Sequence, residues 1–154
     1  MGAQLAPAAC LAVLVGACAG PAAQLDAADQ VAAIEAVLRE QCAAWNRGDI
    51  ESFMALGYWR SPELSFYSGG SANKGYDGVL ARYIARYRDG GAETGHLAFS
   101  DLRVDVLGPD AALARGRWHV DFQSKDDVGG LYTLVFERKS EGWRIVHDHT
   151  SSDD

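Results

Sequence analysis

The residues with the clearest chemical potential lie near the end of the chain, where "RIVHDHTSS" places His147 and His149 on either side of Asp148. Imidazole titrates close to neutral pH, so a histidine can hydrogen-bond a ligand, move a proton or bind a metal ion. The stretch is typical of a strand, and four roles for His149 stay open from sequence alone. These are a polar anchor in a ligand cavity, a general base, a metal ligand and a purely structural group.

Strand alternation decides which of these residues share a face. Successive side chains of a strand point to opposite sides of the sheet. We therefore predict that Trp143, Ile145, His147 and His149 lie on one face and that Asp148 lies on the other. On this prediction Asp148 cannot orient His149, and a carboxylate that tunes this imidazole has to come from another element.

A metal site finds little support in the spacing of the possible ligands. His147 and His149 can chelate together, but a third ligand is needed, and His96 and His119 would have to converge on them. No pair of cysteines, and no cysteine with a histidine, has the spacing of a zinc site. We expect neither a metal nor another cofactor.

Aromatic residues are the second candidate group, because Trp and Tyr combine an apolar body with a polar tip. Most of them fill the core, but "GYWRSP" falls at a break between a helix and a strand, which predicts the rim of a pocket. The predicted ligand-contacting residues are Trp45, Tyr58, Trp59, Phe66, Tyr67, Trp118, Tyr132 and His147.

Residues 1–25 differ in kind from the rest of the 154-residue chain, because they contain no charged side chain. The apolar run 8–15 is too short to span a bilayer and is typical of a secretory signal. Small residues before Gly20 fit cleavage after Ala19, while "VGAC" also resembles a lipobox that would lipidate Cys18. We therefore predict an exported domain over 26–154, periplasmic or lipid-anchored, that meets the membrane only through Cys18.

The net charge of −7 excludes a phosphate-binding surface of the usual kind. The nearest approach to a basic cluster is Arg82, Arg86 and Arg88, which stand at helical spacing among Tyr and Ala. We interpret them as the solvated face of a helix and predict no nucleic-acid partner.

Hydrophobic periodicity predicts the elements that must position these residues. Apolar stripes at spacings of three and four indicate helices over 26–47, 50–57 and 76–89. A short strand is expected at 64–67, a turn at 69–75, and four alternating strands fill 96–150 with an irregularity near 100–101. Helices followed by a long twisted meander must bury their apolar faces together, which predicts an α+β fold with a curled antiparallel sheet and a pocket at its open end.

Four stretches in this order, "AAWNRGDIESFMAL", "GYWRSPELSFYSGG", "GRWHVDF" and "GWRIVHDHTSS", resemble the SnoaL-like branch of the nuclear transport factor 2-like superfamily. The resemblance covers about residues 28–152 and includes relatives of ketosteroid isomerase. It implies a cone-shaped α+β fold with three helices on a curled sheet, an inner cavity, and a homodimer packed through the sheet. It does not imply one function, because members use the cavity in different ways.

Only some catalytic residues of ketosteroid isomerase have a counterpart in this sequence. The strand that holds its carboxylate base reads "LSFYS" here, without an acid. The resemblance implies Gln41 where that enzyme has a helix tyrosine, and Asp121 is the acid nearest to the position of its sheet carboxylate. That specific reaction is therefore not predicted.

The sequence thus predicts a domain that binds a small, mostly apolar molecule. An alternative is a general acid/base enzyme of isomerase, dehydratase or hydrolase type, with His149 as base and Asp121 and Gln41 in support. A further alternative is a non-catalytic assembly module. Whether a reaction is catalysed stays open.

Overall fold

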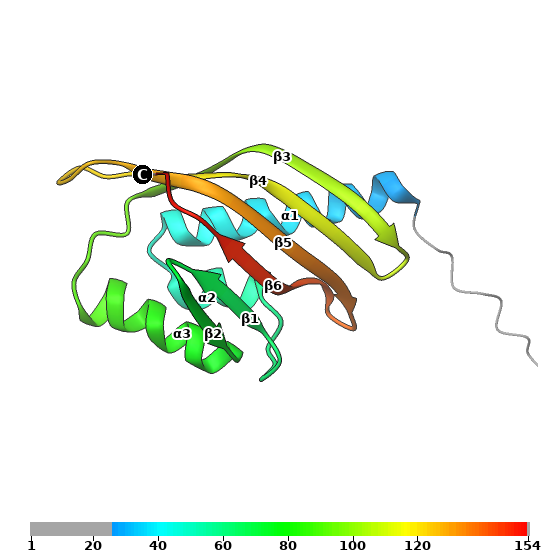
Figure 1. The fold of residues 1–154 in the computed structure, drawn as a ribbon, viewed down its shortest axis with the longest axis horizontal. Coiled ribbons are helices and arrows are strands. Elements are labelled where there is room, and N and C mark those ends of the chain that lie inside the picture. Colours follow the sequence, from blue (N-terminus) through cyan, green and yellow to red (C-terminus); the bar gives the residue numbers. More distant parts are fainter. Residues whose placement is uncertain (1–25, 154) are drawn as a thin grey trace, which may run out of the picture.

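The computed structural model describes residues 26–153. The helices are α1 (Ala27–Asn46), α2 (Ile50–Gly57) and α3 (Tyr76–Ile84), and α3 continues into a π-helical turn, η1 (Ala85–Asp89). The strands are β1 (Ser65–Ser68), β2 (Ser71–Lys74), β3 (His96–Gly108), β4 (Ala111–Asp121), β5 (Val128–Lys139) and β6 (Gly142–Thr150) (Figure 1). The export signal predicted over 1–25 lies outside the described residues. Within them, no helix combines the length and apolarity needed to cross a membrane.

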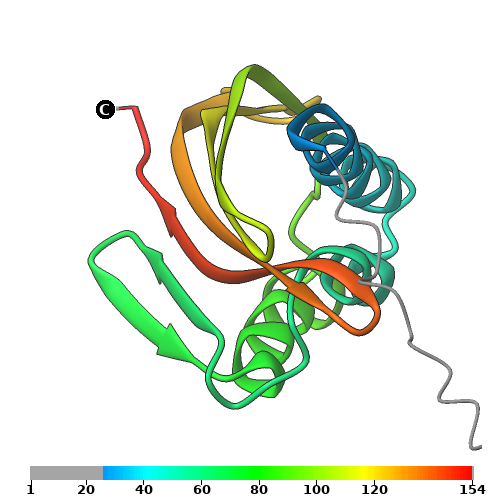
Figure 2. The same ribbon diagram turned by 90° about the vertical axis from the view of Figure 1, so that its right-hand side faces the viewer.

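The predicted α+β fold is confirmed, with one correction to the sheet. Its six strands follow the order β2-β1-β6-β5-β4-β3, and β3 to β6 form the expected antiparallel meander. β1, however, pairs with β6 in parallel, so the sheet is mixed. Seen end-on, the sheet bends round without closing on itself, and the helices lie against the curve (Figure 2).

The turn predicted over 69–75 contains a second strand. Ser71–Lys74 pairs antiparallel with β1 as a short hairpin at the edge of the sheet. Its sequence, "SANK", has no apolar alternation, because the strand is largely exposed and packs no side-chain row into the core. Hydrophobic periodicity therefore had no signal to detect here.

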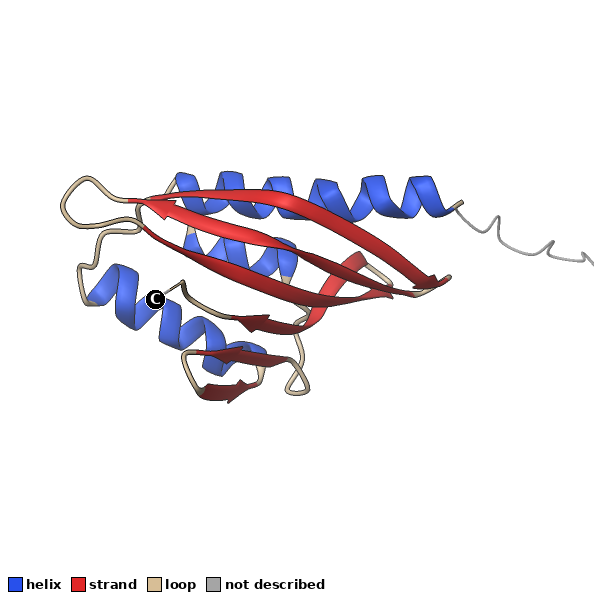
Figure 3. Ribbon diagram, turned by 45° about the horizontal axis from the view of Figure 1, so that its top comes forward, coloured by secondary structure: helices blue, strands red, loops and turns tan. Residues whose placement is uncertain are grey.

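The helices begin where short acidic residues can cap them. Asp26 accepts a hydrogen bond from the Asp29 amide at the start of α1, and Asp49 accepts one from the Ser52 amide at the start of α2. α1 packs against α2 and β3 and runs along the length of the sheet (Figure 3). α1 therefore covers the long strands, and a cavity lies between the sheet, α1 and the α3–η1 segment.

The pairing register shifts at three places in the described strands, of which one, between Val106 and Gly108, lies at the end of β3. The predicted irregularity near 100–101 is confirmed, because the β3–β4 register shifts there and Asp101 has a φ of 53°. A second bulge, which was not predicted, lies in β6. Phe136 pairs with Ile145 and Val135 pairs with His147, so Val146 is an extra residue without a partner on β5.

This second bulge reverses the faces predicted for the end of β6. Trp143 and Ile145 point into the core as expected, but beyond Val146 the inward residue is Asp148. His147 and His149 consequently lie on the outer face. A bulge shifts the alternation by one residue and re-aims every side chain after it.

Candidate functional site

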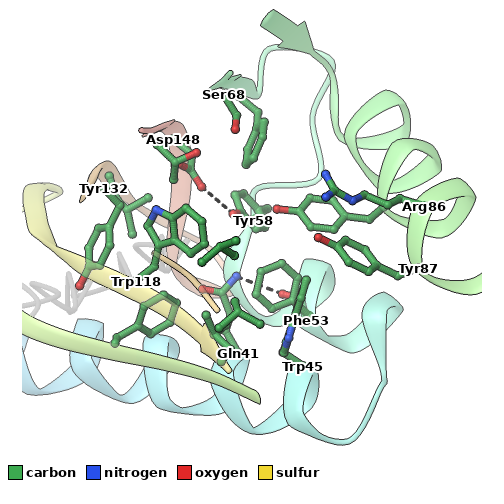
Figure 4. A pocket seen from close by; sticks show the side chains of 18 of the residues that line it. Gln41, Trp45, Phe53, Tyr58, Ser68, Arg86, Tyr87, Trp118, Tyr132 and Asp148 are labelled. Carbon is green, nitrogen blue, oxygen red and sulfur yellow. Dashed lines mark hydrogen bonds between the residues drawn. The ribbon is translucent and has the colours of Figure 1, made fainter. Parts of the chain in front are cut away.

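A cavity of about 290 Å³ opens between the curved sheet, α1 and the α3–η1 segment. Its walls are mostly aromatic and aliphatic, and polar groups occupy its floor and its mouth. Figure 4 shows Trp118 and Tyr132 on the sheet side, with Arg86 and Tyr87 facing them from the helical segment. A concave, mostly apolar hollow with a smaller number of placed polar groups is the usual form of a small-molecule site.

The helical wall of the cavity is a connected group of aromatic rings. Trp45 meets Phe53 and Tyr87 edge to face, with ring centroids 5.1 and 4.9 Å apart. Tyr83 packs against Phe53 at 5.6 Å and Phe66 at 5.9 Å. Each ring contacts at least one other, so the rings support one another in this wall.

The floor of the cavity carries a buried carboxyl group. Asp148 is 3% exposed, and its Oδ2 accepts a 2.7 Å hydrogen bond from the Tyr58 hydroxyl. The other oxygen, Oδ1, is buried and has no hydrogen-bond partner among the described residues. Burial raises the pKa of Asp148 from 3.8 to about 7, and the bond from Tyr58 offsets only part of this rise.

Tyr58 and Tyr83 extend this group into a short polar chain. The hydroxyls of the two tyrosines interact with each other, and burial raises the pKa of both. The charge of Asp148 raises them further. Both tyrosines therefore stay protonated at neutral pH, and Asp148 is the member of the chain that titrates there.

Backbone pairing fixes Tyr58 beside Asp148. After α2 ends, Tyr58 forms a parallel bridge with Ile145, and the Trp59 amide donates to the Ile145 carbonyl at 3.0 Å. Three residues further along β6, the bulge turns Asp148 inward beneath the same tyrosine. The contact thus depends on the pairing of Tyr58 with β6 and on the extra residue in β6.

Five of the eight predicted ligand-contacting residues line the cavity: Trp45, Tyr58, Phe66, Trp118 and Tyr132. The cavity lining also includes Gln41, which was predicted to support catalysis. Gln41 is buried, and its amide donates to the Phe53 carbonyl at 3.1 Å, so it joins α1 to α2. Whether these residues contact a ligand stays a prediction.

The prediction that His147 and His149 lie in the cavity is wrong. His149 is exposed on the outer face, and His147 lies beside it with its Nδ1 2.6 Å from the Ser65 hydroxyl. Tyr67, also predicted as a pocket residue, packs on both imidazoles from the same outer face, at 5.0 and 6.0 Å. The β6 bulge accounts for the histidines, and pairing of β1 with β6 places Tyr67 in the same row.

Trp59 and Asp121 also lie away from the cavity. Tyr58 takes the inward position at the end of α2, so Trp59 points outward, where the Lys139 ammonium lies 3.7 Å above its ring. Asp121 is exposed at the end of β4, with Oδ1 2.7 Å from His119 Nε2. Neither residue is placed to act on a molecule in the hollow.

The outer histidines do not share a site with a third ligand. Among residues 26–153, neither belongs to a group of three His, Cys, Asp or Glu side chains whose ligand atoms lie close together. His119, Asp121 and Asp127 do form such a group, with ligand atoms within 4.8 Å, but all three are exposed. Exposed groups of this kind are common without an ion, and we assign it no function.

Sequence reasoning missed the most distinctive group of the cavity, the Asp148 carboxyl, and also the role of Tyr83 and Tyr87 as its helical wall. One signal was present for Asp148. Ile145 and Val146 are adjacent apolar residues, and such a pair breaks strict alternation. A pair of this kind is consistent with a bulge but does not require one.

Comparison with known proteins agrees with this architecture. Residues 34–153 match the family described as SnoaL-like domain. A crystal structure of an NTF2-like protein of unknown function from Shewanella oneidensis is 34% identical, covers 80% of this chain and 98% of its own, and superposes with a TM-score of 0.71. Among curated proteins, none matches this chain.

More distant structures share the fold. An NTF2-like superfamily protein from Salmonella enterica is 19% identical, with a TM-score of 0.72, over 84% of this chain and 94% of its own. A ketosteroid isomerase-like protein from Erwinia carotovora is 19% identical, with a TM-score of 0.66, over 82% and 98%. The chain therefore belongs to the SnoaL-like domain family and has the nuclear transport factor 2-like fold.

Proposed function

We propose that this domain binds a small, mostly apolar molecule in its cone, with one polar group of the ligand hydrogen-bonded to Asp148. The single observation that carries the proposal is the Asp148 Oδ1 atom, which is buried at the floor of a mostly apolar hollow and has no hydrogen-bond partner within residues 26–153. A buried oxygen left unpaired costs about 1–3 kcal/mol. A ligand that bonds this oxygen removes that cost and also covers apolar surface.

The cavity limits the size and chemistry of the ligand. A volume of about 290 Å³ lies at the small end of ligand sites, which suits a molecule of about ten heavy atoms. Below pH 7 the Asp148 carboxyl is mainly protonated and donates to a carbonyl oxygen. Above it the carboxylate repels that oxygen, so binding of a carbonyl compound weakens as the pH rises.

Acetophenone is a suitable probe because it combines one ring with one carbonyl. Its affinity is measured through the fluorescence of Trp45 and Trp118, which line the cavity. Asp148→Leu keeps the approximate volume but removes the hydrogen bond, and we expect about tenfold weaker binding. His149→Ala changes the next residue on the opposite face and is expected to bind as the wild type does.

Asp148→Asn provides the second measurement. Its amide still donates to a carbonyl but does not titrate near neutral pH, so binding is expected to persist and to lose its pH dependence. Folding of each variant is checked by circular dichroism. Equal binding by wild type and Asp148→Leu, or no saturable binding by the wild type, contradicts the proposal.

Proton transfer is the second candidate, favoured by the pKa of about 7 for Asp148. A general base works best when its pKa lies near the working pH. In this scheme the carboxylate takes a proton from the carbon next to a bound carbonyl and returns it to the substrate. The predicted base thus moves from His149, which faces away from the cavity, to Asp148.

Deuterium exchange separates catalysis from binding. In D₂O, the methyl group of acetophenone is expected to exchange faster with the wild type than with Asp148→Asn, with a rate that rises through an apparent pKa of about 7. Proton NMR follows the loss of the methyl signal. Binding without accelerated exchange leaves the domain as a binding protein.

Export and the homodimer stay predictions. We propose export from the uncharged, apolar segment 1–25. Mass spectrometry of the mature N-terminus distinguishes cleavage after Ala19 from lipidation of Cys18. We propose the homodimer from the resemblance, with the outer face of the sheet as its interface. Light scattering of the purified domain measures its mass in solution.

A further inference from the structure

The mouth of the cavity carries three cations that approach from two sides. Arg82 lies on α3, Arg86 lies in η1, and Lys125 lies in the loop between β4 and β5. All three line the cavity, although the sequence predicts that the arginines only solvate a helix face. The cluster is positive although the net charge of the chain is −7.

These cations lack carboxylate partners within residues 26–153. No ion pair involves Arg82, Arg86 or Lys125, whereas Arg88, in the same turn, pairs with Glu51 at 2.6 Å. Glu93 is close enough for Lys125 to lower its pKa, but Glu93 mainly accepts hydrogen bonds from Ser124 and the Gln123 amide. Among the described residues, the positive charge of the mouth is therefore not neutralised by an ion pair.

Local packing holds two of the charged groups at the opening. The Arg86 guanidinium lies 5.2 Å from the centre of the Tyr87 ring, and the Lys125 ammonium lies 3.8 Å from the centre of the Phe122 ring. Both rings line the cavity. Figure 4 shows Arg86 reaching from its helix toward the hollow, beside Tyr87.

The π-helical turn contributes to this placement. Arg82 and Arg86 are four residues apart, as are Tyr83 and Tyr87. The two pairs therefore lie side by side on the helical segment. The Gly90 amide bonds to the Ala85 carbonyl at 2.8 Å, which is the five-residue spacing of a π-turn. Such turns recur at functional sites because they widen the helix locally.

We propose, on the basis of the proposed function above, that the ligand class is an amphipathic organic acid. Its carboxylate lies at Arg82, Arg86 and Lys125, its ring or chain fills the apolar middle, and a neutral polar group reaches Asp148. Arginine suits a carboxylate because its planar donors match the two oxygens. Asp148 fixes the orientation, since a buried carboxyl group disfavours a second one beside it.

The position of the arginines favours a singly charged anion over a phosphate. They lie toward the C-terminal end of the α3–η1 segment, where the helix dipole is negative. Phosphate sites are commonly built on helix N-termini, which supply free amides and a positive dipole. No helix N-terminus is needed to hold a carboxylate between two guanidinium groups.

A matched pair of probes tests this ligand class. 3-(4-hydroxyphenyl)propanoate carries a hydroxyl for Asp148 and a carboxylate for the mouth, and 3-(4-hydroxyphenyl)propanamide is its neutral counterpart. Isothermal titration is expected to show the acid binding about tenfold more tightly than the amide. The difference should shrink in about 0.5 M salt, because partly exposed charges are screened.

Variants separate the mouth from the floor. In the double variant Arg82→Gln with Arg86→Gln, the acid is expected to bind no better than the amide. Arg88→Gln is the matched control, because Arg88 lies in the same turn outside the cavity lining, and it should keep the preference. Thermal unfolding confirms that both proteins are folded.

Three results overturn the assignment in distinguishable ways. Equal binding of acid and amide to the wild type, with Asp148→Leu still weakening both, refutes the anionic class and leaves the proposed function standing. Tighter binding of phenyl phosphate than of the acid refutes the choice of carboxylate. No binding of either probe to the wild type, together with no effect of Asp148 on acetophenone, refutes both proposals.

Discussion

Both faces of β6 carry titratable residues, but the surroundings of these residues differ greatly. On the inner face, Asp148 is enclosed by the cavity wall and bonded to the Tyr58 hydroxyl at 2.7 Å. On the outer face, His147 and His149 flank it in sequence and contact Tyr67 at the surface. Three consecutive residues therefore divide into one buried acid and two outward imidazoles.

Burial favours the uncharged forms of Asp148 and His147, but to different extents. The pKa of Asp148 rises to about 7 because the carboxylate loses its water, and the pKa of His147 falls because its ring is partly buried beside His149. Residue type alone favoured the histidines as the active groups. The extra residue Val146 places Asp148, and not the histidines, at the cavity.

The largest expected contrast between the faces is in stability. Phe136 points inward from β5 and is 0% exposed, while Leu131 points outward and is 51% exposed. Phe136→Ala is expected to lower the free energy of unfolding by about 3–5 kcal/mol, because it leaves a cavity in the core. Leu131→Ala should cost less than about 1 kcal/mol, unless the outer face is covered.

Urea unfolding at two protein concentrations measures both variants. A loss for Leu131→Ala as large as that for Phe136→Ala, and dependent on concentration, would show that the outer face is buried in an oligomer. The simple distinction between an inner core and an outer surface would then fail.

The next largest effect concerns the cost of burying Asp148. In the unfolded chain this carboxyl ionises near pH 3.8, and in the fold near pH 7. Between these values the folded state holds a proton that the unfolded state has lost. Stability therefore falls as the pH rises from about 4 to 7 and stays low above that range.

Asp148→Asn removes this titration. At about pH 8 the variant is expected to be more stable than the wild type by as much as about 4 kcal/mol, and near pH 4 the advantage should vanish. Thermal unfolding across this range measures the difference, with His149→Gln as a control from the outer face. A constant difference between Asp148→Asn and the wild type at every pH would contradict the assigned burial of the carboxyl.

Most of the fold was predictable because it depends on periodic apolar patterns. Stripes such as Ile34, Leu38 and Trp45 predict α1, and turn residues such as Gly108 predict the ends of the strands. The four resembling stretches supply the order of elements that defines the family. Even the irregularity at Asp101 was anticipated, since polar residues there interrupt the alternation of β3.

The remainder depends on interactions that periodicity does not encode. β2 is short, polar and exposed, so it leaves no apolar pattern in the sequence. The bulge at Val146 follows from the way β6 pairs with β5 on one side and with Tyr58 and β1 on the other. Five of the eight predicted ligand-contacting residues line the cavity, but the extra residue reverses the faces at the end of β6 and places His147 and His149 outside it.

A smaller effect tests the close packing on the inner face of β4. A Cβ added at Gly116 would meet the Tyr132 hydroxyl and lie 2.7 Å from the Ser100 carbonyl. Gly116→Ala is expected to cost about 1–3 kcal/mol, because Tyr132 must shift within the cavity wall. Gly108→Ala, where a Cβ would meet nothing within 4 Å, should be nearly neutral.

Chemical denaturation compares the two glycine variants, and acetophenone binding reports whether the wall has moved. Weaker binding by Gly116→Ala but not by Gly108→Ala is the expected pattern. If both variants are equally stable, Tyr132 is free to move, and the sheet side of the cavity is less rigid than its packing indicates.

The smallest effect lies on the outer face and has the opposite dependence on pH. His147 bonds to the Ser65 hydroxyl at 2.6 Å, and its pKa is lowered in the fold, so the folded state favours the neutral ring. As the pH falls below about 6.5, the unfolded chain takes up a proton that the folded chain resists, and stability declines slightly. His147→Gln should remove this decline and leave the behaviour above pH 7 unchanged.

Melting temperatures of the Asp148→Asn variant, measured with and without the additional change His147→Gln, separate this effect from the larger titration of Asp148. If stability instead rises toward acid pH in the protein that keeps His147, and not in the His147→Gln variant, the ring gains rather than loses a proton on folding.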